Sequence, residues 1–438
     1  AALSAGLSVL LAIPVARALA RRSFRGRRAL VSLLGAPFIL PVLVAVFGLI
    51  AVFGRTGMVN AIGEALGLAP FTIYGPQGVI LAHVFFNMPL ATWRHLEWPM
   101  LRAVVPGTLL AIFLICLTSF AVALAVGGGP RATTIELRIY ELFRFEFALG
   151  DAALMALVQF SVCTLAAALA AIITVPKVAM AGLDGVTQRW DAQSWVLRAQ
   201  DVLVLSLAAG FLLVPTGAVL VNGVGVLFAL PTNVWVAAGT SLVVALASMA
   251  LSVVMTLSLA LWIARGRRGA RMAGDVISGL ARTAAPLVMG TGLFILLFGW
   301  TDPQALALPI TALVNAAVTV PFGLRVLAPA AAEVEAAYGR LSASLSITGW
   351  ARLRLVTLPR LRKPLGFSAG LAAALSMGDL GVIALFSSPG TETLPLAMYR
   401  LMAAYQMDLA AGAALVLVTM SFGLFYLFDR GGRVDADG

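Results

Sequence analysis

Eleven long apolar runs limit the folds open to this chain more than any other feature. They lie near 1–20, 30–53, 77–93, 103–126, 149–173, 202–222, 234–263, 276–300, 305–327, 365–388 and 408–428. A helix of about 20 apolar residues crosses the hydrocarbon core of a bilayer, whereas the strands of a membrane barrel give short alternating segments. With 61% hydrophobic and 11% charged residues, the chain is also too apolar for a soluble domain. The sequence predicts an all-α polytopic membrane protein.

The basic residues gather in segments that would lie on one side of the membrane. The segments 20–28, 265–271 and 325–363 are rich in arginine, and further arginines follow the last apolar run. Short loops rich in Lys and Arg stay in the cytoplasm, so these segments are predicted to be cytoplasmic. The net charge of +11 then reflects topology and gives no support to nucleic-acid binding. Eleven spans put the two chain ends on opposite sides of the membrane, so a cytoplasmic C-terminus places Ala1 outside. We therefore expect the natural protein to have twelve spans.

Two stretches of the chain repeat each other in order. The pattern P-x3-T-[IL]-x-L-x2-Y occurs at 130–140 and again at 389–399, an offset of 259, and Pro-x-Leu-Arg occurs at 99–102 and 359–362. Parallel repeats of this kind place a transport path between the two halves. We predict two homologous membrane halves, 1–182 and 201–438, a cytoplasmic linker at 183–200, and a cytoplasmic loop at 328–364 in the second half.

The first half is shorter than the second by about 31 residues. Asn87 and Asn315 end equivalent apolar runs but lie only 228 positions apart, so the shortfall falls between Thr92 and Glu97. In the second half the same interval is the long cytoplasmic loop. Either the first half has lost this loop, or the natural protein has a loop there that the sequence omits. We favour the second explanation.

The loop at 328–364 resembles the "EAA" loop of ABC-importer permeases. The resemblance rests on the run Gly-Trp-x-x-Leu-x-x-Val-x-Leu-Pro at 349–359. It implies that a short coupling helix, within 342–350, docks in a groove of an ATPase subunit. The family spacing puts Arg340 where the family has its glutamate and Ser346 where it has its glycine, while Glu335 lies out of register. The ATPase-docking residues implied are Arg340, Leu345, Ser346, Gly349 and Trp350.

A longer resemblance covers nearly the whole chain. The strings LPVLVAVFG at 40–48, LAHVFFNMPLAT at 81–92, GGGPRATTIEL at 127–137 and LSMGDLGVIALF at 375–386 resemble the thiamine permeases of bacterial vitamin B1 ABC importers. This implies the type I ABC importer permease fold in a bacterial cytoplasmic membrane. It also implies two ABC ATPase subunits and a periplasmic thiamine-binding protein as partners. Fused ferric-iron permeases share the architecture, so iron import is the alternative.

The chain has no nucleotide-binding motif of its own. A Walker A motif needs Gly-Lys followed by Ser or Thr, but the two lysines, Lys177 and Lys363, follow Pro and Arg. We therefore expect a transport subunit that is not an enzyme, binds no cofactor and has membrane lipid around it. ATP and Mg²⁺ would be used by the partner ATPase.

Several side chains are candidates for a path that carries thiamine, which has a cationic thiazolium ring and an aminopyrimidine ring. Aromatic faces and carboxylates attract such a cation. The repeat supplies Tyr140 and Tyr399 near the outer face, with Glu136 and Glu392 close by, although both tyrosines could instead anchor helices at the interface. Asp379 lies in an apolar run, where it could meet a cation, serve an ion-coupled secondary transporter, or cap a helix; we favour the structural role.

Overall fold

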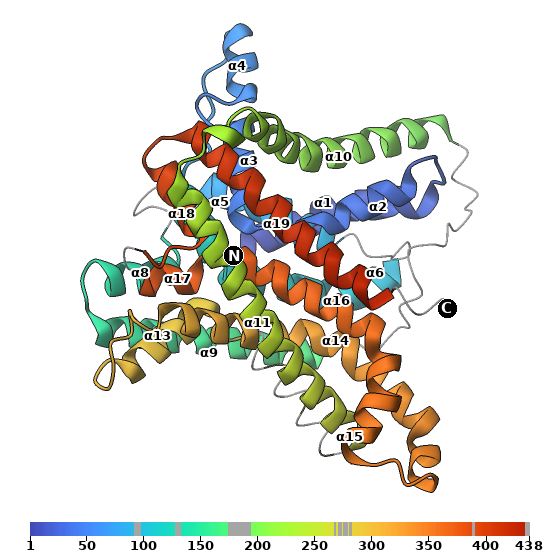
Figure 1. The fold of residues 1–438 in the computed structure, drawn as a ribbon. Helices are drawn as coiled ribbons and strands as arrows, with labels where there is room; N and C mark the ends of the chain where they lie inside the picture. The colour runs from blue at the N-terminus through green and yellow to red at the C-terminus, as the bar shows by residue number, and fades with distance from the viewer. Residues whose placement is uncertain are drawn as a thin grey trace.

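Helices account for all the regular structure in the part of the chain that the computed structural model describes (Figure 1). That part comprises residues 1–91, 98–127, 133–173, 194–266, 283–387 and 390–433, together with Gly269, Gly274 and Gly279. Up to residue 173 the helices are α1 (Ala2–Arg21), α2 (Arg27–Gly35), α3 (Val42–Phe53), α4 (Met58–Ala65), α5 (Pro76–Ala91), α6 (Trp98–Leu117), α7 (Phe120–Val126), α8 (Ile135–Arg144) and α9 (Leu149–Ile173). From residue 194 they are α10 (Trp195–Val224), α11 (Thr232–Arg265), α13 (Pro286–Leu297), α14 (Ala307–Ser344), α15 (Gly349–Arg352), α16 (Leu358–Met377), α17 (Gly381–Phe386), α18 (Leu394–Ala403) and α19 (Met407–Arg433).

The membrane character predicted from the apolar runs is confirmed. Among the described residues, eight helices are long and apolar enough to cross a membrane, or nine if one bent pair counts as a span. The predicted count of eleven differs because some runs form shorter or broken helices. The run at 103–126 divides into α6 and α7, which are bent by 58°. The run at 276–300 gives only the 12-residue α13 within the described part, and α5 has 16 residues.

The helices of the two predicted halves pack in corresponding ways. The last helix before the predicted linker, α9, packs against α13, and the last helix of the chain, α19, packs against α3. The helices α3 and α13 each have 12 residues and each begins beside a proline. The largest buried cluster draws on both halves, including Phe85, Ile139, Phe386 and Leu417. The division at 183–200 stays a prediction, because residues 174–193 lie outside the described ranges.

The helix α10 joins the two halves by packing on the first one. It contacts α1, α3 and α19, and at Gly48 of α3 the backbones come so close that an added Cβ would lie 2.5 Å from the carbonyl oxygen of Pro215. Near its other end Asp201 accepts 2.7 Å hydrogen bonds from Arg21 and from Arg22. A buried ion pair lacking one partner is strongly destabilising, so this cluster fixes α10 against α1.

The loop predicted at 328–364 does not consist of separate surface helices. Its first part is the end of α14, a single helix of 38 residues that runs through to Ser344. After a turn the chain continues through α15 and one π-helical turn at Leu353–Thr357 directly into α16. The expected loop is therefore a helical hairpin that projects from the membrane helices (Figure 1). The predicted shortfall between Thr92 and Glu97 lies outside the described residues.

Candidate functional site

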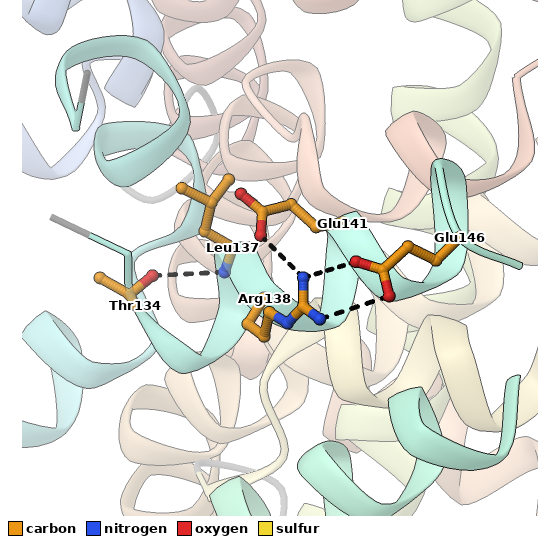
Figure 2. A network of polar contacts seen from close by, with 5 residues as sticks. All are labelled: Thr134, Leu137, Arg138, Glu141 and Glu146. Atoms are coloured by element: carbon orange, nitrogen blue, oxygen red, sulfur yellow. Dashed lines mark hydrogen bonds and ion pairs between the residues drawn. The ribbon is translucent and has the colours of Figure 1, made fainter. Parts of the chain in front are cut away.

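The short helix α8 has a polar face held in place by its own charges (Figure 2). At its N-cap, Thr134 Oγ1 accepts a hydrogen bond of 3.3 Å from the backbone N–H of Leu137. On the polar face, Arg138 Nη1 donates to Glu146 Oε1 at 2.7 Å and to Glu141 Oε2 at 3.4 Å. Glu146 lies in the turn after the helix, so this partly exposed network links α8 to that turn on its outer side, while Leu137, Ile139, Leu142 and Phe143 are buried on its inward side.

Glu136 lies on the inward side of α8 and not at the outer surface where its sequence position suggested it. It is 1% exposed. Gln159 of α9 donates from Nε2 to Glu136 Oε1 at 2.9 Å, and the backbone N–H of Phe120 also donates to the Glu136 carboxyl group. Burial raises the pKa of Glu136 to about 8, because the charged form loses its hydration there.

Asp379 lies at the break between α16 and α17. Its Oδ1 and Oδ2 accept hydrogen bonds from the backbone N–H groups of Gly381 and Val382 at 3.3 and 3.4 Å, and the side chain of Asn315 also donates to it. It therefore has the geometry of a cap for the broken span. Its carboxylate is also close enough to act electrostatically on that of Glu136, which brings an acid from each predicted half together.

The two tyrosines also approach each other across the predicted halves. Burial raises the pKa of both hydroxyls, and Tyr140 adds to the rise at Tyr399, whereas Arg144 and Arg400 lower the pKa of Tyr140. The ring of Tyr140 packs on Phe120 of α7, with centroids 5.2 Å apart. Both side chains are half-buried.

The remaining path candidate, Glu392, is already paired. Its carboxylate accepts a charge-assisted hydrogen bond from Arg400 of α18. The structure thus brings Glu136, Asp379, Tyr140 and Tyr399 towards one region between the halves, while Glu392 belongs to a pair near the start of α18.

The residues expected to dock an ATPase lie at the tip of the helical hairpin formed by α14 and α15. Leu345 and Trp350 are 61% and 70% exposed, and Arg340 is exposed on the last turns of α14. Ser346 and Gly349 have φ of +54° and +57°, which turns the chain sharply between α14 and α15. The prediction of one coupling helix over 342–350 is therefore wrong in form: the segment is a helix end, a turn and a helix start.

Two contacts were missed by the sequence analysis. Gln159 was not singled out, although it is the only carboxamide in α9 and polar side chains at membrane depth commonly have functions. Glu335 was set aside as out of register, but it accepts hydrogen bonds of 2.8 Å from Arg352 and one of 3.3 Å from Arg265. It thereby braces α15 against α14 and the end of α11.

Long apolar helices, spans broken at matching places, and an exposed helical hairpin define a polytopic membrane permease. No family model matches the chain. The chain is 38% identical to the thiamine transport system permease protein ThiP of Salmonella typhimurium, covering 98% of this chain and 86% of that protein, and it is equally similar to ThiP of Escherichia coli. ThiP of Haemophilus influenzae is 32% identical over 100% of this chain and 87% of its own length. The chain belongs to the thiamine transport system permease family.

These alignments also bear on the length of the chain. The alignment with the Salmonella protein runs over 470 positions, which exceeds the 438 residues of this chain. That relative therefore carries internal residues that have no counterpart here. The excess is of the same order as the segment predicted to be missing between Thr92 and Glu97.

Proposed function

We propose that this chain is the transmembrane subunit of an ATP-driven importer that carries thiamine across a bacterial cytoplasmic membrane. The observation that carries the proposal is similarity over nearly the full chain to several proteins named as thiamine transport permeases. Ferric-iron import and ion-coupled transport are not favoured, because none of these relatives bears such a name.

The chemistry of the region between the halves suits this substrate. Thiamine carries a permanent positive charge on one ring, and cations are attracted to aromatic faces and to carboxylates. Tyr140, Tyr399, Glu136 and Asp379 supply such groups from both halves, and Glu392 stands near the start of α18. We assign these five residues to the substrate path.

Energy would come from partner subunits. The sequence lacks a Walker A motif, so two ABC ATPase subunits are proposed to bind and hydrolyse ATP with Mg²⁺ on the cytoplasmic side. Exposed apolar side chains at the end of a rigid helix suit docking into a groove. We assign this role to Leu345 and Trp350, with Arg340, Ser346 and Gly349 shaping the tip around them. A periplasmic thiamine-binding protein would deliver the substrate on the opposite side.

Transport by the reconstituted complex tests the proposal. The permease is placed in proteoliposomes with its ATPase partner, and uptake of radiolabelled thiamine and of ferric iron is measured with and without the binding protein. We expect thiamine uptake that requires both ATP and the loaded binding protein, and no uptake of iron. Iron uptake, or thiamine uptake driven by an ion gradient without the ATPase, would contradict it.

A further inference from the structure

A cavity lies where the start of α16 meets the end of α19 (Figure 1). It has a volume of about 360 Å³ and is lined by Lys363, Phe367, Asp429 and Arg433. The two helices cross closely beside it, since a Cβ added to Gly432 would lie 2.8 Å from the backbone carbonyl oxygen of Arg362. Pockets of roughly 300–1,000 Å³ hold small ligands, so the cavity is large enough for a ligand group.

The cavity presents two cationic side chains and one acid. Asp429 accepts hydrogen bonds from Arg433 Nε at 3.0 Å and Nη2 at 3.2 Å, which uses both carboxylate oxygens and fixes the guanidinium in place. Lys363 has no hydrogen bond or ion pair with any residue that the structure describes. Both cationic side chains are exposed, so a ligand can reach them. The excess positive charge of the cavity therefore belongs to an accessible ammonium group and suits an anion.

The remaining wall of the cavity is apolar. Phe367 lies one turn after Lys363 on α16, is half-buried, and packs edge-to-face on Phe425 of α19 with ring centroids 5.7 Å apart. Phosphate oxygens accept strong, charge-assisted hydrogen bonds from lysine and arginine. A cationic rim next to an aromatic wall thus matches a ligand that carries both a phosphate and hydrocarbon.

The cavity lies at the depth expected for lipid headgroups. The apolar run of α16 begins at residue 365 and that of α19 ends at residue 428, so Lys363, Asp429 and Arg433 lie just beyond the apolar parts of two membrane helices. Phe367 lies just inside. The arginine-rich segments predict that this side of the membrane is cytoplasmic. Basic pockets between membrane helices on that side are typical binding sites for anionic lipid headgroups.

A neighbouring arginine distinguishes this cavity from the hairpin. Arg360, one turn before Lys363, has its guanidinium carbon 3.7 Å from the ring centroid of Tyr338 on α14. Arg360 is thus engaged with the hairpin that is proposed to dock an ATPase, whereas Lys363 lines the cavity with α19. The membrane is therefore favoured over the docked protein as the source of the anion.

We propose that Lys363 and Arg433 bind the phosphate of an anionic phospholipid, phosphatidylglycerol being the simplest, while Phe367 packs against its glycerol and first acyl carbons. The bound lipid holds the start of α16 and the end of α19 together at their close crossing. Free phosphate shares the charge of the headgroup but has no hydrocarbon to contact Phe367. The site does not depend on which substrate the permease transports.

The rate at which an amine-reactive reagent acylates Lys363 tests the site, because an ammonium group bound to phosphate reacts more slowly. The full chain is placed in nanodiscs of phosphatidylcholine, with or without phosphatidylglycerol, and peptide mass spectrometry gives the rate. Two further arms add inorganic phosphate at equal ionic strength, or the ATPase, to the phosphatidylcholine nanodiscs. Arg430→Lys is the matched control: it places an amine at the same end of α19 but outside the cavity lining, and reports the general effect of membrane charge.

We expect phosphatidylglycerol to slow acylation of Lys363 by about fivefold more than acylation at position 430, as the attraction of one basic residue to anionic lipid predicts. Arg433→Gln should remove most of this difference, because it frees Asp429 to pair with Lys363 in either lipid. Equal slowing at the two positions would overturn the site. Slowing by inorganic phosphate as strong as that by the lipid, or slowing only with the ATPase, would also overturn it and assign the cavity to a soluble anion or to that protein. Thiamine uptake is no part of this measurement, so its result leaves the proposed function untouched.

Discussion

The segments α7–α9 and α17–α19 share their backbone arrangement but bury different side chains. In each, a short helix is followed by a helix of ten residues that begins after a threonine, Thr134 or Thr393. Each ten-residue helix is followed by a turn with one non-glycine residue at positive φ, Phe147 at 51° and Tyr405 at 58°. A long helix then crosses the membrane. The backbone of the repeat is thus retained at its turns as well as in its spans.

The polar contacts within these segments differ. Thr134 accepts from its own helix, whereas the first N–H of α18, at Leu394, donates to Ser241 of α11 at 2.7 Å. At the offset of 259, Glu136 is matched by Pro395, and after the turns at Phe147 and Tyr405, which lie 258 positions apart, Gln159 is matched by Leu417. Apolar burial and caps therefore account for what the halves share. The side chains by which they differ are the ones that carry candidate functions.

The largest expected effect concerns the hairpin tip, which only the second half shows among the described residues. Replacing Trp350 with Asp should weaken ATPase binding at least tenfold and abolish stimulation by the loaded binding protein, because removal of a central aromatic anchor commonly costs about 2 kcal/mol or more. Trp300→Asp, before the start of α14 and 88% exposed, is the control. Pull-down and ATPase assays measure both. Normal assembly and stimulation in the Trp350 variant would refute docking at this tip.

The next effect tests the close crossing of α16 and α19. A Cβ at Gly366 would lie 2.6 Å from the carbonyl oxygen of Phe428 and 2.8 Å from the Cα of Gly432, both backbone atoms that have little room to move. Gly366→Leu should therefore destabilise the permease by about 2 kcal/mol or more, measured as a loss of thermal stability in detergent. Gly423→Leu, with nothing within 4 Å, should change little. Equal stability of the two variants would show that this crossing is looser than described.

A smaller effect is expected where Glu335 braces the hairpin. Arg352→Glu should leave the exposed tip residues unchanged but release α15, so coupling of ATP hydrolysis to uptake should fall a few-fold, as partly exposed ion pairs contribute about 1 kcal/mol or less. The charge-swapped pair Glu335→Arg with Arg352→Glu should restore part of it, because an arginine at position 335 would pair with a glutamate at position 352 but would repel Arg265. The ratio of thiamine imported to ATP hydrolysed is the measurement. A defect that the swap does not relieve would point to direct contact of Arg352 with the ATPase.

Hydropathy predicted the membrane helices well because lipid exposure leaves few choices of side chain. It did not predict that α6 and α7 are separate, although the adjacent polar residues Thr118 and Ser119 mark the break in the apolar run at 103–126. Nor did it place Glu136 inside the protein, because the inward face of α8 is formed by Ile139 and Phe143, which pack against helices distant in sequence. Gln159 was missed because a single carboxamide in a helix of 25 residues can be interpreted only once its partner is known.

The smallest effect is expected at Asp379, and it separates the role of this partly buried acid from that of Glu136. Asn at this position keeps an oxygen to accept from the N-terminus of α17 and removes the charge, and Asn is as good a cap as Asp. We therefore expect Asp379→Asn to change stability by less than about 1 kcal/mol and to slow thiamine uptake less than Glu136→Gln does. Asp379→Ala, which loses the hydrogen bonds to Gly381 and Val382, should lower stability by about 1 kcal/mol. Thermal unfolding and uptake by the same preparations decide the matter. If Asp379→Asn abolishes uptake in a stable, fully assembled complex, the main attraction for the cation would come from Asp379. The second half, and not the first with Glu136, would then carry the more important acid.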